Sequence, residues 1–213
     1  MRKTLIKKFN SEFDLINFFI DSLKKFNDKS KIRIGVSGGS VSEFLINNIK
    51  SLERYCKDNL VFIQLILIDE RCVKFENNLK NDKKYINELK NSKYITFDNP
   101  FKNPKLKYFL YPIEKLLRKY DELDIVLMGF GLDGHTAGIF DKKKIFSKHD
   151  YIINQDNNDL RRVSFSLNYL NNSKKIVLFS TGNTKYEFFK KIKNNNNYIL
   201  NSLNYSECLF LII

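Results

Sequence analysis

Short apolar runs alternate with amphipathic segments along the whole length of this 213-residue chain. Apolar runs rich in β-branched residues and bounded by turn-forming residues are typical of strands, and apolar residues repeating every three or four positions are typical of helices. The runs predict strands near 31–36, 60–68, 124–129, 162–167, 175–180 and 207–213. The helical spacing predicts helices near 12–26, 41–52, 79–91, 112–120 and 184–193.

The order of these elements favours an α/β fold. The run Phe62–Ile68 is almost continuously apolar, as in a strand of a parallel sheet that is buried on both faces. Strands alternating with helices predict parallel βαβ units, so we expect a Rossmann-like three-layer α/β/α fold with a mainly parallel sheet. Segment 92–111 is predicted to be irregular and the polar segment 142–159 to be a mobile loop. No repeat or linker divides the chain, and residues 1–213 are interpreted as one domain.

Composition fits a domain whose core needs no covalent support. A chain of this length can bury a sufficient core, and its three cysteines have no C-x-x-C pairing, so neither disulfides nor a zinc site is indicated. Cys72 follows Arg71, and a neighbouring cation can favour a thiolate; the alternative, which we favour, is a small buried hydrophobic residue. A reducing compartment is therefore expected.

The termini and the charge do not change this picture. The basic segment 1–10 lacks the apolar core of a signal peptide, and the longest apolar run, 60–68, is too short to cross a bilayer, so a cytoplasmic protein without membrane attachment is expected. The net charge of +13 raises the possibility of nucleic-acid binding. The lysines are scattered among Asn, Ile and Tyr rather than gathered in a basic arm, which argues against a specific nucleic-acid partner.

The most informative segment is Met128–Ala137, which follows the apolar run near 124–129. Its glycine-rich turn presents Asp133 and, two residues later, His135, one of only two histidines in the chain. Open α/β sheets build their sites at the carboxyl ends of strands, and histidine titrates near neutral pH and can accept a proton from water. The alternative is a tight turn with a surface histidine.

Two other predicted strands end in residues that could bind a ligand or take part in a reaction. Residues Ser37, Gly38, Gly39 and Ser40 follow the strand at 31–36 and precede a helix, where free backbone N–H groups attract anions. Ser40 and Glu43 have the spacing of a capping box, which predicts that Ser40 caps this helix. Asp69, Glu70 and Arg71 end the strand at 60–68; elsewhere such a cluster is commonly a solvated strand end.

Together these segments resemble the 6-phosphogluconolactonase family, within the larger group that includes the glucosamine-6-phosphate deaminases. The family pattern has an S-G-G-S-T-P loop, then D-E-R-x-V, then G-x-G-x-D-G-H-T-A-S-L-F-P. The chain matches it at 37–40, 69–73 and 129–140, while Arg162 and Lys185 lie in weaker matches to R-I-T and G-x-x-K. The resemblance extends from about residue 31 to about residue 190.

Several positions depart from the family pattern. Val41 and Ser42 replace the Thr-Pro of the serine loop, and Asp141 replaces the final proline. The family's S-N-Y is interpreted as Lys83-Lys84-Tyr85, with the loss of two polar contacts. The chain ends at the apolar segment 207–213, where relatives continue into a final helix, so a missing C-terminal helix or excision from a longer protein is expected.

The resemblance implies metal-free hydrolysis of 6-phospho-D-glucono-1,5-lactone to 6-phosphogluconate without a cofactor. His135 would act as general base, and either Asp133 or Asp69 would orient its imidazole. Asp69 could instead bind substrate hydroxyls. The 6-phosphate would lie on the amides of the serine loop with three cations as counter-charges. The implied phosphate-binding residues are Ser37, Gly38, Gly39, Ser40, Arg71, Arg162 and Lys185, with Arg161 as a competitor for the place of Arg162.

Two other functions remain open at this point. The deaminases carry D-G-H-I-A-F-N-E and D-E-Y, whereas this chain has Phe140 in place of the glutamate and Arg71 in place of the tyrosine, which favours the lactonase. A non-catalytic sugar-phosphate binding module is the other alternative, although such a module has little use for His135. Some relatives are fused to glucose-6-phosphate dehydrogenase, so association with that enzyme is a further possible partnership.

Overall fold

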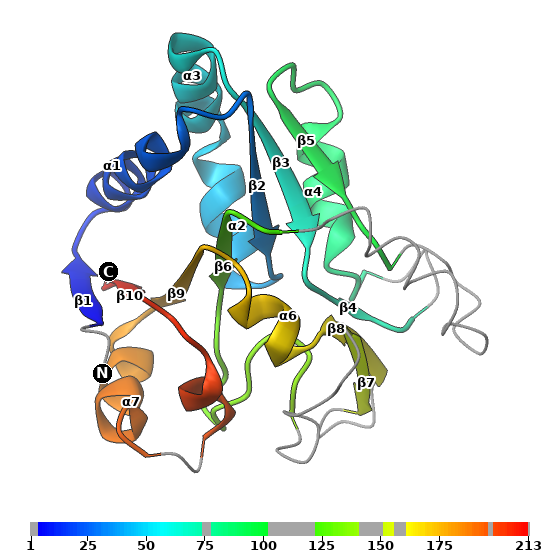
Figure 1. The fold of residues 1–213 in the computed structure, drawn as a ribbon. Coiled ribbons are helices and arrows are strands. Elements are labelled where there is room, and N and C mark those ends of the chain that lie inside the picture. Colours follow the sequence, from blue (N-terminus) through cyan, green and yellow to red (C-terminus); the bar gives the residue numbers. More distant parts are fainter. Residues whose placement is uncertain are drawn as a thin grey trace.

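The protein is built on a parallel sheet of seven strands, seen in a computed structural model that describes residues 4–73, 78–101, 122–140, 151–155, 161–195 and 198–212. The strand order is β1-β10-β9-β6-β2-β3-β5, and every neighbouring pair is parallel (Figure 1). The strands are β1 (Leu5–Phe9), β2 (Lys31–Val36), β3 (Phe62–Leu67), β5 (Ile95–Asp98), β6 (Ile125–Met128), β9 (Lys175–Thr181) and β10 (Glu207–Leu211). The expected α/β class and mainly parallel sheet are confirmed.

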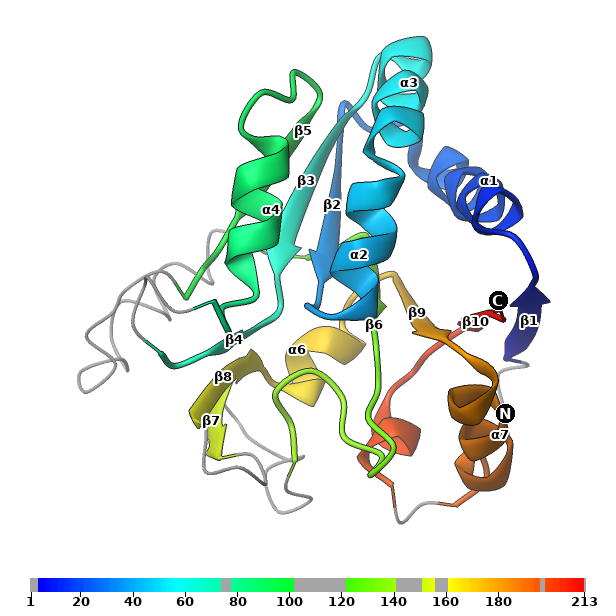
Figure 2. The same cartoon turned by 180° about the vertical axis from the view of Figure 1, so that it is seen from behind.

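Helices cover both faces of this sheet. They are α1 (Glu12–Leu23), α2 (Ser40–Asn47), α3 (Ile49–Asn59), α4 (Asp82–Leu89), α6 (Leu167–Asn171) and α7 (Asn183–Ile192), with 3-10 turns at Lys24–Phe26 and Ile199–Ser202. In Figure 1 α6 lies in front of the sheet, and Figure 2, from behind, brings α2 and α4 to the front. The two faces carry separate apolar clusters, one with α1 to α4 and the other with α6 and α7.

Successive side chains of a strand point to opposite faces of the sheet, which produces these two clusters. In β6, Ile125 and Leu127 pack into the cluster beneath α1 to α4, whereas Val126 and Met128 pack into the cluster on the opposite face. All four side chains are buried, which is why this strand reads as an unbroken apolar run. Burying such a side chain contributes about 1.5–3 kcal/mol, so the alternation stabilises both layers at once.

The order in which successive strands are added to the sheet reverses between β2 and β6. From β2 it continues outward to β3 and β5, whereas from β6 it continues to β9 and β10 on the other side. Such a switch point leaves a crevice at the carboxyl ends of the two strands. Here the loops of Ser37–Ser40 and Gly129–His135 meet, joined by the hydrogen bond from Gly129 N to Ser37 Oγ at 3.2 Å.

A second, smaller sheet lies beside this crevice and was not expected. It is antiparallel, with order β4 (Asp69–Arg71), β8 (Arg161–Phe165) and β7 (Tyr151–Gln155). The pairing places Asp69 opposite Ser164 and Arg71 opposite Arg162. The acidic and basic residues that end the predicted strand at 60–68 therefore form a strand of their own.

Several predicted boundaries differ from the structure. The helix expected at 41–52 is two helices, because Asn48 interrupts it with φ −106° and ψ 17°. Segment 92–111 contains β5, and the loop expected over 142–159 contains β7. The prediction that these two segments are irregular throughout is therefore wrong. Strand β1 and helix α6 were also missed. The helix expected at 112–120 lies outside the described residues.

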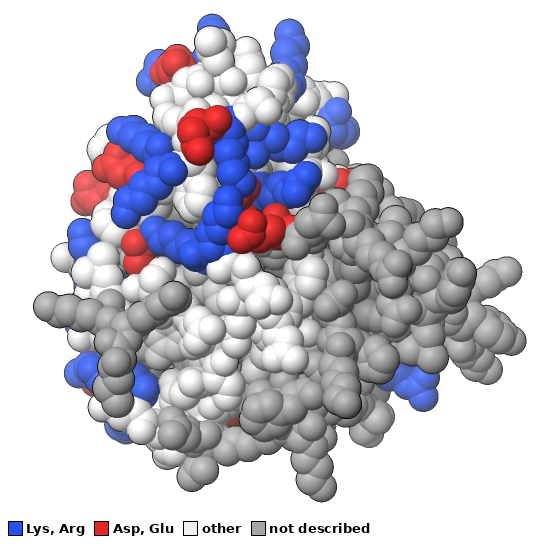
Figure 3. Space-filling model, in the orientation of Figure 1, with Lys and Arg blue, Asp and Glu red and all other residues white. Residues whose placement is uncertain are grey.

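The surface combines both signs of charge. On the face drawn in Figure 3, acidic side chains lie among the lysines and arginines rather than apart from them. Ion pairs such as Lys24–Asp21 at 2.7 Å and Lys190–Glu187 at 2.8 Å are exposed and contribute little to stability. Across the described ranges, none of the helices is long and apolar enough to cross a membrane.

Candidate active site

A pocket of about 210 Å³ opens at the carboxyl ends of β2 and β6. The residues that line it come from the three predicted motifs, from the starts of β8 and α7, and from Asn81 just before α4. The predicted residues that line it are Ser37, Gly38, Gly39, Ser40, Asp69, Arg71, His135, Arg162 and Lys185. Asp133 does not line the pocket but contacts the ring of His135. Segments distant in the sequence thus meet at one place.

The serine loop is held from two sides. Gly39 has φ +64°, a conformation that glycine adopts without the penalty of a Cβ atom. The hydroxyl of Tyr85 donates to the carbonyl of Ser37 at 2.8 Å, and Ser37 Oγ accepts from Gly129 N. The loop backbone is therefore fixed with the start of α2 at the pocket, the arrangement that suits an anion.

The predicted capping box is wrong. Helix α2 begins at Ser40 with Gly39 at its N-cap, and no side chain caps it. Ser42 instead donates from its hydroxyl to the Gly39 carbonyl at 2.7 Å, and Glu43 pairs with Lys84 at 2.8 Å on the surface. Helix α2 therefore starts one residue earlier than expected, and Ser40, its first residue, lines the pocket.

The loop after β6 curls back so that Asp133 faces His135. Gly131 N donates to the His135 carbonyl at 2.9 Å, and Gly134 has φ +80°. A Cβ atom on Gly131 would lie 2.3 Å from the imidazole of His135, so only glycine leaves room for this ring. Ala137 follows with φ +48°, a conformation rare outside glycine.

The Asp133–His135 pair has the geometry of a carboxylate orienting a base. Asp133 Oδ1 lies 2.5 Å from His135 Nδ1 and also accepts from the His135 backbone N–H at 3.2 Å. Burial opposes ionisation of Asp133, but the charge of His135 and these hydrogen bonds outweigh it and lower the pKa of Asp133. With Nδ1 bonded to a carboxylate, Nε2 is the nitrogen that can accept a proton.

Asp69 has a different environment. It is buried, and burial raises its pKa, although the charges of Arg162, Arg71 and His135 and a hydrogen bond from Asn81 work in the opposite direction. Its Oδ2 lies 3.6 Å from Arg162 Nη1, and its Oδ1 has no hydrogen-bond partner among the described residues. Of the two acids considered for orienting the imidazole, the structure places Asp133 in contact with it.

Three cationic side chains line the pocket. Lys185 donates to the carbonyl of Phe130, and burial lowers its pKa although the charge of Asp133 acts against that effect. Arg162 is half-buried, whereas the competing Arg161 is exposed, because neighbouring residues of β8 point to opposite faces. The third cation, Arg71, donates to Asn81 Oδ1 at 3.0 Å.

Asn81 was missed in the sequence. It lines the pocket, whereas the lysines aligned with the family's S-N-Y do not; Lys84 is exposed and paired with Glu43. Asn81 stands four residues before Tyr85, which is one turn of helix, so the two lie on one face. That spacing was a usable signal, but Asn81 belongs to no motif on which the prediction rested.

Cysteine chemistry and a metal cluster find no support in the described part of the chain. Burial, and then the charge of Glu70, raise the pKa of Cys72 to about 11, which argues against a thiolate; the side chain is partly buried and packs against the apolar cluster that contains α6 and α7. Within the described ranges, no three His, Cys, Asp or Glu side chains come together as metal ligands would. His149 lies outside these ranges.

Comparisons with known families and curated proteins give consistent results. Residues 13–200 match the family model described as glucosamine-6-phosphate isomerases/6-phosphogluconolactonase. A 6-phosphogluconolactonase of Helicobacter pylori is 26% identical over 216 residues, covering 93% of this chain and 85% of that protein. A Caenorhabditis elegans protein, provisionally named as a 6-phosphogluconolactonase, is 29% identical over 178 residues. That alignment covers 76% of this chain but 65% of the worm protein, just under two thirds of its length.

Solved structures share the fold. The 6-phosphogluconolactonase of Thermotoga maritima superimposes with a TM-score of 0.76 over 99% of both chains, at 18% identity. A structure described as a monomeric glucosamine-6-phosphate deaminase reaches 0.74 at 17% identity, covering 98% of this chain and 97% of that one. Similarity at this level shows the architecture, and it does not separate the two activities.

Proposed function

Because the chain belongs to the glucosamine-6-phosphate isomerase/6-phosphogluconolactonase family, we propose that it hydrolyses 6-phospho-D-glucono-1,5-lactone to 6-phosphogluconate. The observation that carries the proposal is the 2.5 Å contact between Asp133 and His135, at a pocket that three cationic side chains also line. Hydrolysis of a lactone that carries a phosphate group requires a base to activate water and, beside it, a loop that can bind the phosphate. The names of the relatives agree with this activity.

In the proposed mechanism His135 activates water without a metal or cofactor. Nε2 takes a proton from the water as its oxygen attacks the lactone carbonyl, and Asp133 stabilises the imidazolium that forms. The tetrahedral intermediate then collapses, the bond to the ring oxygen breaks, and His135 returns the proton to that oxygen. The product is the open-chain acid, and the base is regenerated.

The substrate phosphate is assigned to the serine loop. Its second pKa is near 6, so it is close to a dianion at neutral pH and suits the amides of Gly38 and Gly39 with three cations nearby, Arg71, Arg162 and Lys185. A bound dianion would oppose the lowering of the Lys185 pKa and keep that amine charged. Asp69 is assigned to substrate hydroxyls, because its Oδ1 is buried and has no partner within the described chain.

The deaminase alternative is less favoured. Phe140 stands where those enzymes have a glutamate, and its ring packs on His135 with centroids 4.3 Å apart. The phenyl ring of Phe140 has no ionisable group, so it cannot take the place of that glutamate in acid–base ring opening. Association with glucose-6-phosphate dehydrogenase remains a prediction from the resemblance.

The test follows lactone disappearance after glucose-6-phosphate dehydrogenase generates the lactone in place, at slightly acidic pH where spontaneous opening is slow. We expect His135→Ala to lower kcat by about 10²–10⁴-fold while 6-phosphogluconate still binds, because proton transfer contributes about that much. Leu132→Ala is the matched control, since this exposed side chain belongs to the same loop but not to the pocket lining.

Two results would argue against the proposed function, and a third would argue against its mechanism. A wild type no faster than buffer would exclude the lactonase, and turnover of glucosamine 6-phosphate would then indicate a deaminase. Binding of 6-phosphogluconate without any turnover would instead indicate a sugar-phosphate binding module. Full activity in His135→Ala would keep the lactonase but remove its proposed base.

A further inference from the structure

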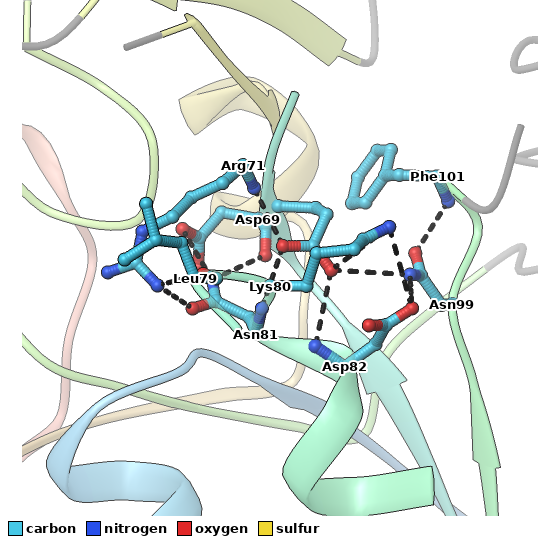
Figure 4. A network of polar contacts seen from close by, with 9 residues as sticks. Asp69, Arg71, Leu79, Lys80, Asn81, Asp82, Asn99 and Phe101 are labelled. Atoms are coloured by element: carbon cyan, nitrogen blue, oxygen red, sulfur yellow. Dashed lines mark hydrogen bonds and ion pairs between the residues drawn. The ribbon is translucent and has the colours of Figure 1, made fainter. Parts of the chain in front are cut away.

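A cluster of buried polar side chains surrounds the start of α4 (Figure 4). Its members come from β4, from the residues that begin α4, and from the end of β5. They are Glu70, Lys80, Asn81, Asp82 and Asn99, each at most 8% exposed. Of these, Asn81 lines the pocket, and the mechanism above uses none of them. The cluster therefore needs its own explanation.

Glu70 is the centre of this cluster. Its Oε1 accepts from Arg71 N at 2.7 Å and from Asn81 N at 2.8 Å. Its Oε2 accepts from Asp82 N at 3.2 Å and from Asn99 Nδ2 at 3.4 Å. One carboxylate thus joins strand β4 to the beginning of a helix that follows it in the sequence.

These contacts replace an ordinary helix cap. The first N–H groups of a helix have no intrahelical partner, and an N-cap asparagine usually accepts from one of them through its side chain. Asn81 is the N-cap residue of α4, yet its side chain makes no capping hydrogen bond. Glu70, reaching from β4, accepts from the N–H groups of Asn81 and Asp82, which are the N-cap and the first residue of the helix.

The side chain of Asn81 is thereby available to the pocket. Its Nδ2 donates to the Asp69 carbonyl at 3.0 Å and to Asp69 Oδ2 at 3.3 Å, and its Oδ1 accepts from Arg71 Nη1 at 3.0 Å. A Cβ atom on Gly38 would lie 2.2 Å from Asn81 Oδ1, so the amide also packs closely against the serine loop. Asn81 therefore links the acid, the arginine and the phosphate loop of the pocket.

We propose that Glu70 is a positioning residue that caps α4 from the neighbouring strand and so holds Asn81 against Asp69 and Arg71. The proposal rests on the lactonase function, because Asp69 and Arg71 are assigned to substrate binding. Glu70 does not line the pocket and acts through Asn81.

The kinetic test compares Glu70→Gln, Asn81→Ala and the double variant. The glutamine keeps the size of the side chain and one acceptor oxygen, but it replaces the other oxygen with an amide donor that faces N–H groups in need of an acceptor. Measured above the raised pKa of Glu70, about 7, each single variant should lose about ten- to hundredfold in kcat/KM, mainly through KM, as small misplacements of binding groups do. If Glu70 acts through Asn81, the double variant loses no more than Asn81→Ala alone.

Asp124→Asn is the matched control. Asp124 is also a buried carboxylate, which accepts from Arg33 N at 2.9 Å and pairs with Lys174 at 3.3 Å. It lies just before β6, at the opposite end of that strand from the pocket. We expect this variant to lose stability with little change in KM, measured under conditions where circular dichroism shows every variant to be folded.

Three outcomes would overturn the proposal: unchanged kcat/KM in Glu70→Gln, losses that multiply in the double variant, or an equal KM change in Asp124→Asn. A crystal structure of Glu70→Gln tests the proposal separately from catalysis. Asn81 turned away from Asp69 onto the α4 amides would support it, and an unmoved Asn81 would overturn it. A wild type without lactonase activity would refute the proposed function and leave this structural test decisive.

Discussion

Leu60 and Ala137 are the non-glycine residues with positive φ angles in the described chain. They differ in their surroundings, because one lines the pocket and the other lies on the surface. Ala137 belongs to the pocket lining, where local strain is commonly retained for function. Leu60 is the C-cap of α3 with φ 54° and ψ 36°, and its side chain is 85% exposed. Nothing around Leu60 explains the strain except the turn from α3 into β3.

We therefore expect Leu60→Gly to stabilise the protein by about 0.5–1 kcal/mol. Glycine adopts this conformation without the Cβ clash, which outweighs its greater freedom in the unfolded chain, and little packing is lost. The measurement is urea unfolding, in which the midpoint concentration should rise while the dependence of the unfolding free energy on urea concentration stays the same. Leu60→Ala is the control, because it removes the same side chain but keeps the Cβ atom; equal stabilisation by both variants would contradict the backbone explanation.

At the scale of elements, the junction of β4 and α4 combines a functional arrangement with a stability cost. Burial raises the pKa of Glu70 from 4.5 to about 7, and Asp82 adds to that rise. The N–H groups of Asn81 and Arg71 and the charge of Lys80 oppose it. The ionised carboxylate that caps the helix is therefore less favourable in the folded protein than in the unfolded chain.

This shift predicts a pH-dependent difference between the wild type and Glu70→Gln. Between pH 4.5 and about 7 the folded protein holds the Glu70 proton that the unfolded chain has released, so stability falls as pH rises. From pH 4.5 to pH 8 the unfolding free energy of the wild type should fall relative to the variant by about 3 kcal/mol. Urea unfolding at several pH values checks this; a constant difference, or one of opposite sign, would contradict it.

Neighbouring elements also explain which predictions succeeded. The strands β3, β6 and β9 were anticipated because most of their side chains are buried, on both faces of the sheet, and their sequences contain nearly continuous apolar runs. Strand β2 was anticipated from its β-branched residues, although Lys31 and Arg33 interrupt the apolar pattern. Strand β1 was missed because LIKKF, an edge strand with no fully buried residue, has neither an apolar run nor a regular alternation. The three-residue β4 and four-residue β5 are too short to show a period.

At the scale of the whole molecule, one sheet separates two apolar layers that depend on each other. Residues of β3, β6, β9 and β10 contribute alternately to both clusters, so neither layer can form without the sheet. We propose that residues 1–213 fold as a single domain. Far-ultraviolet circular dichroism and tyrosine fluorescence should then report one coincident unfolding transition, whereas separate midpoints would indicate two independent units.

The sequence by itself determined the chemistry of the strand ends. The turns that carry Ser37–Ser40 and Asp133–His135 are local, since glycines, strand exits and helix starts are specified within a few residues. The segments that meet in the pocket could therefore be named in advance, and so could the α/β class. The assignment of Arg162 rather than Arg161 needed the pairing of β8.

Only the tertiary structure decided how these segments meet. It placed β2 beside β6, put Asp133 rather than Asp69 against the imidazole, and brought Glu70 to the start of α4. Each of these depends on contacts between residues far apart in the chain or on the exact path of a loop, for which a sequence pattern contains no distance. The role of Asn81 follows from a cap supplied by another element, and no local rule predicts a cap from a distant strand.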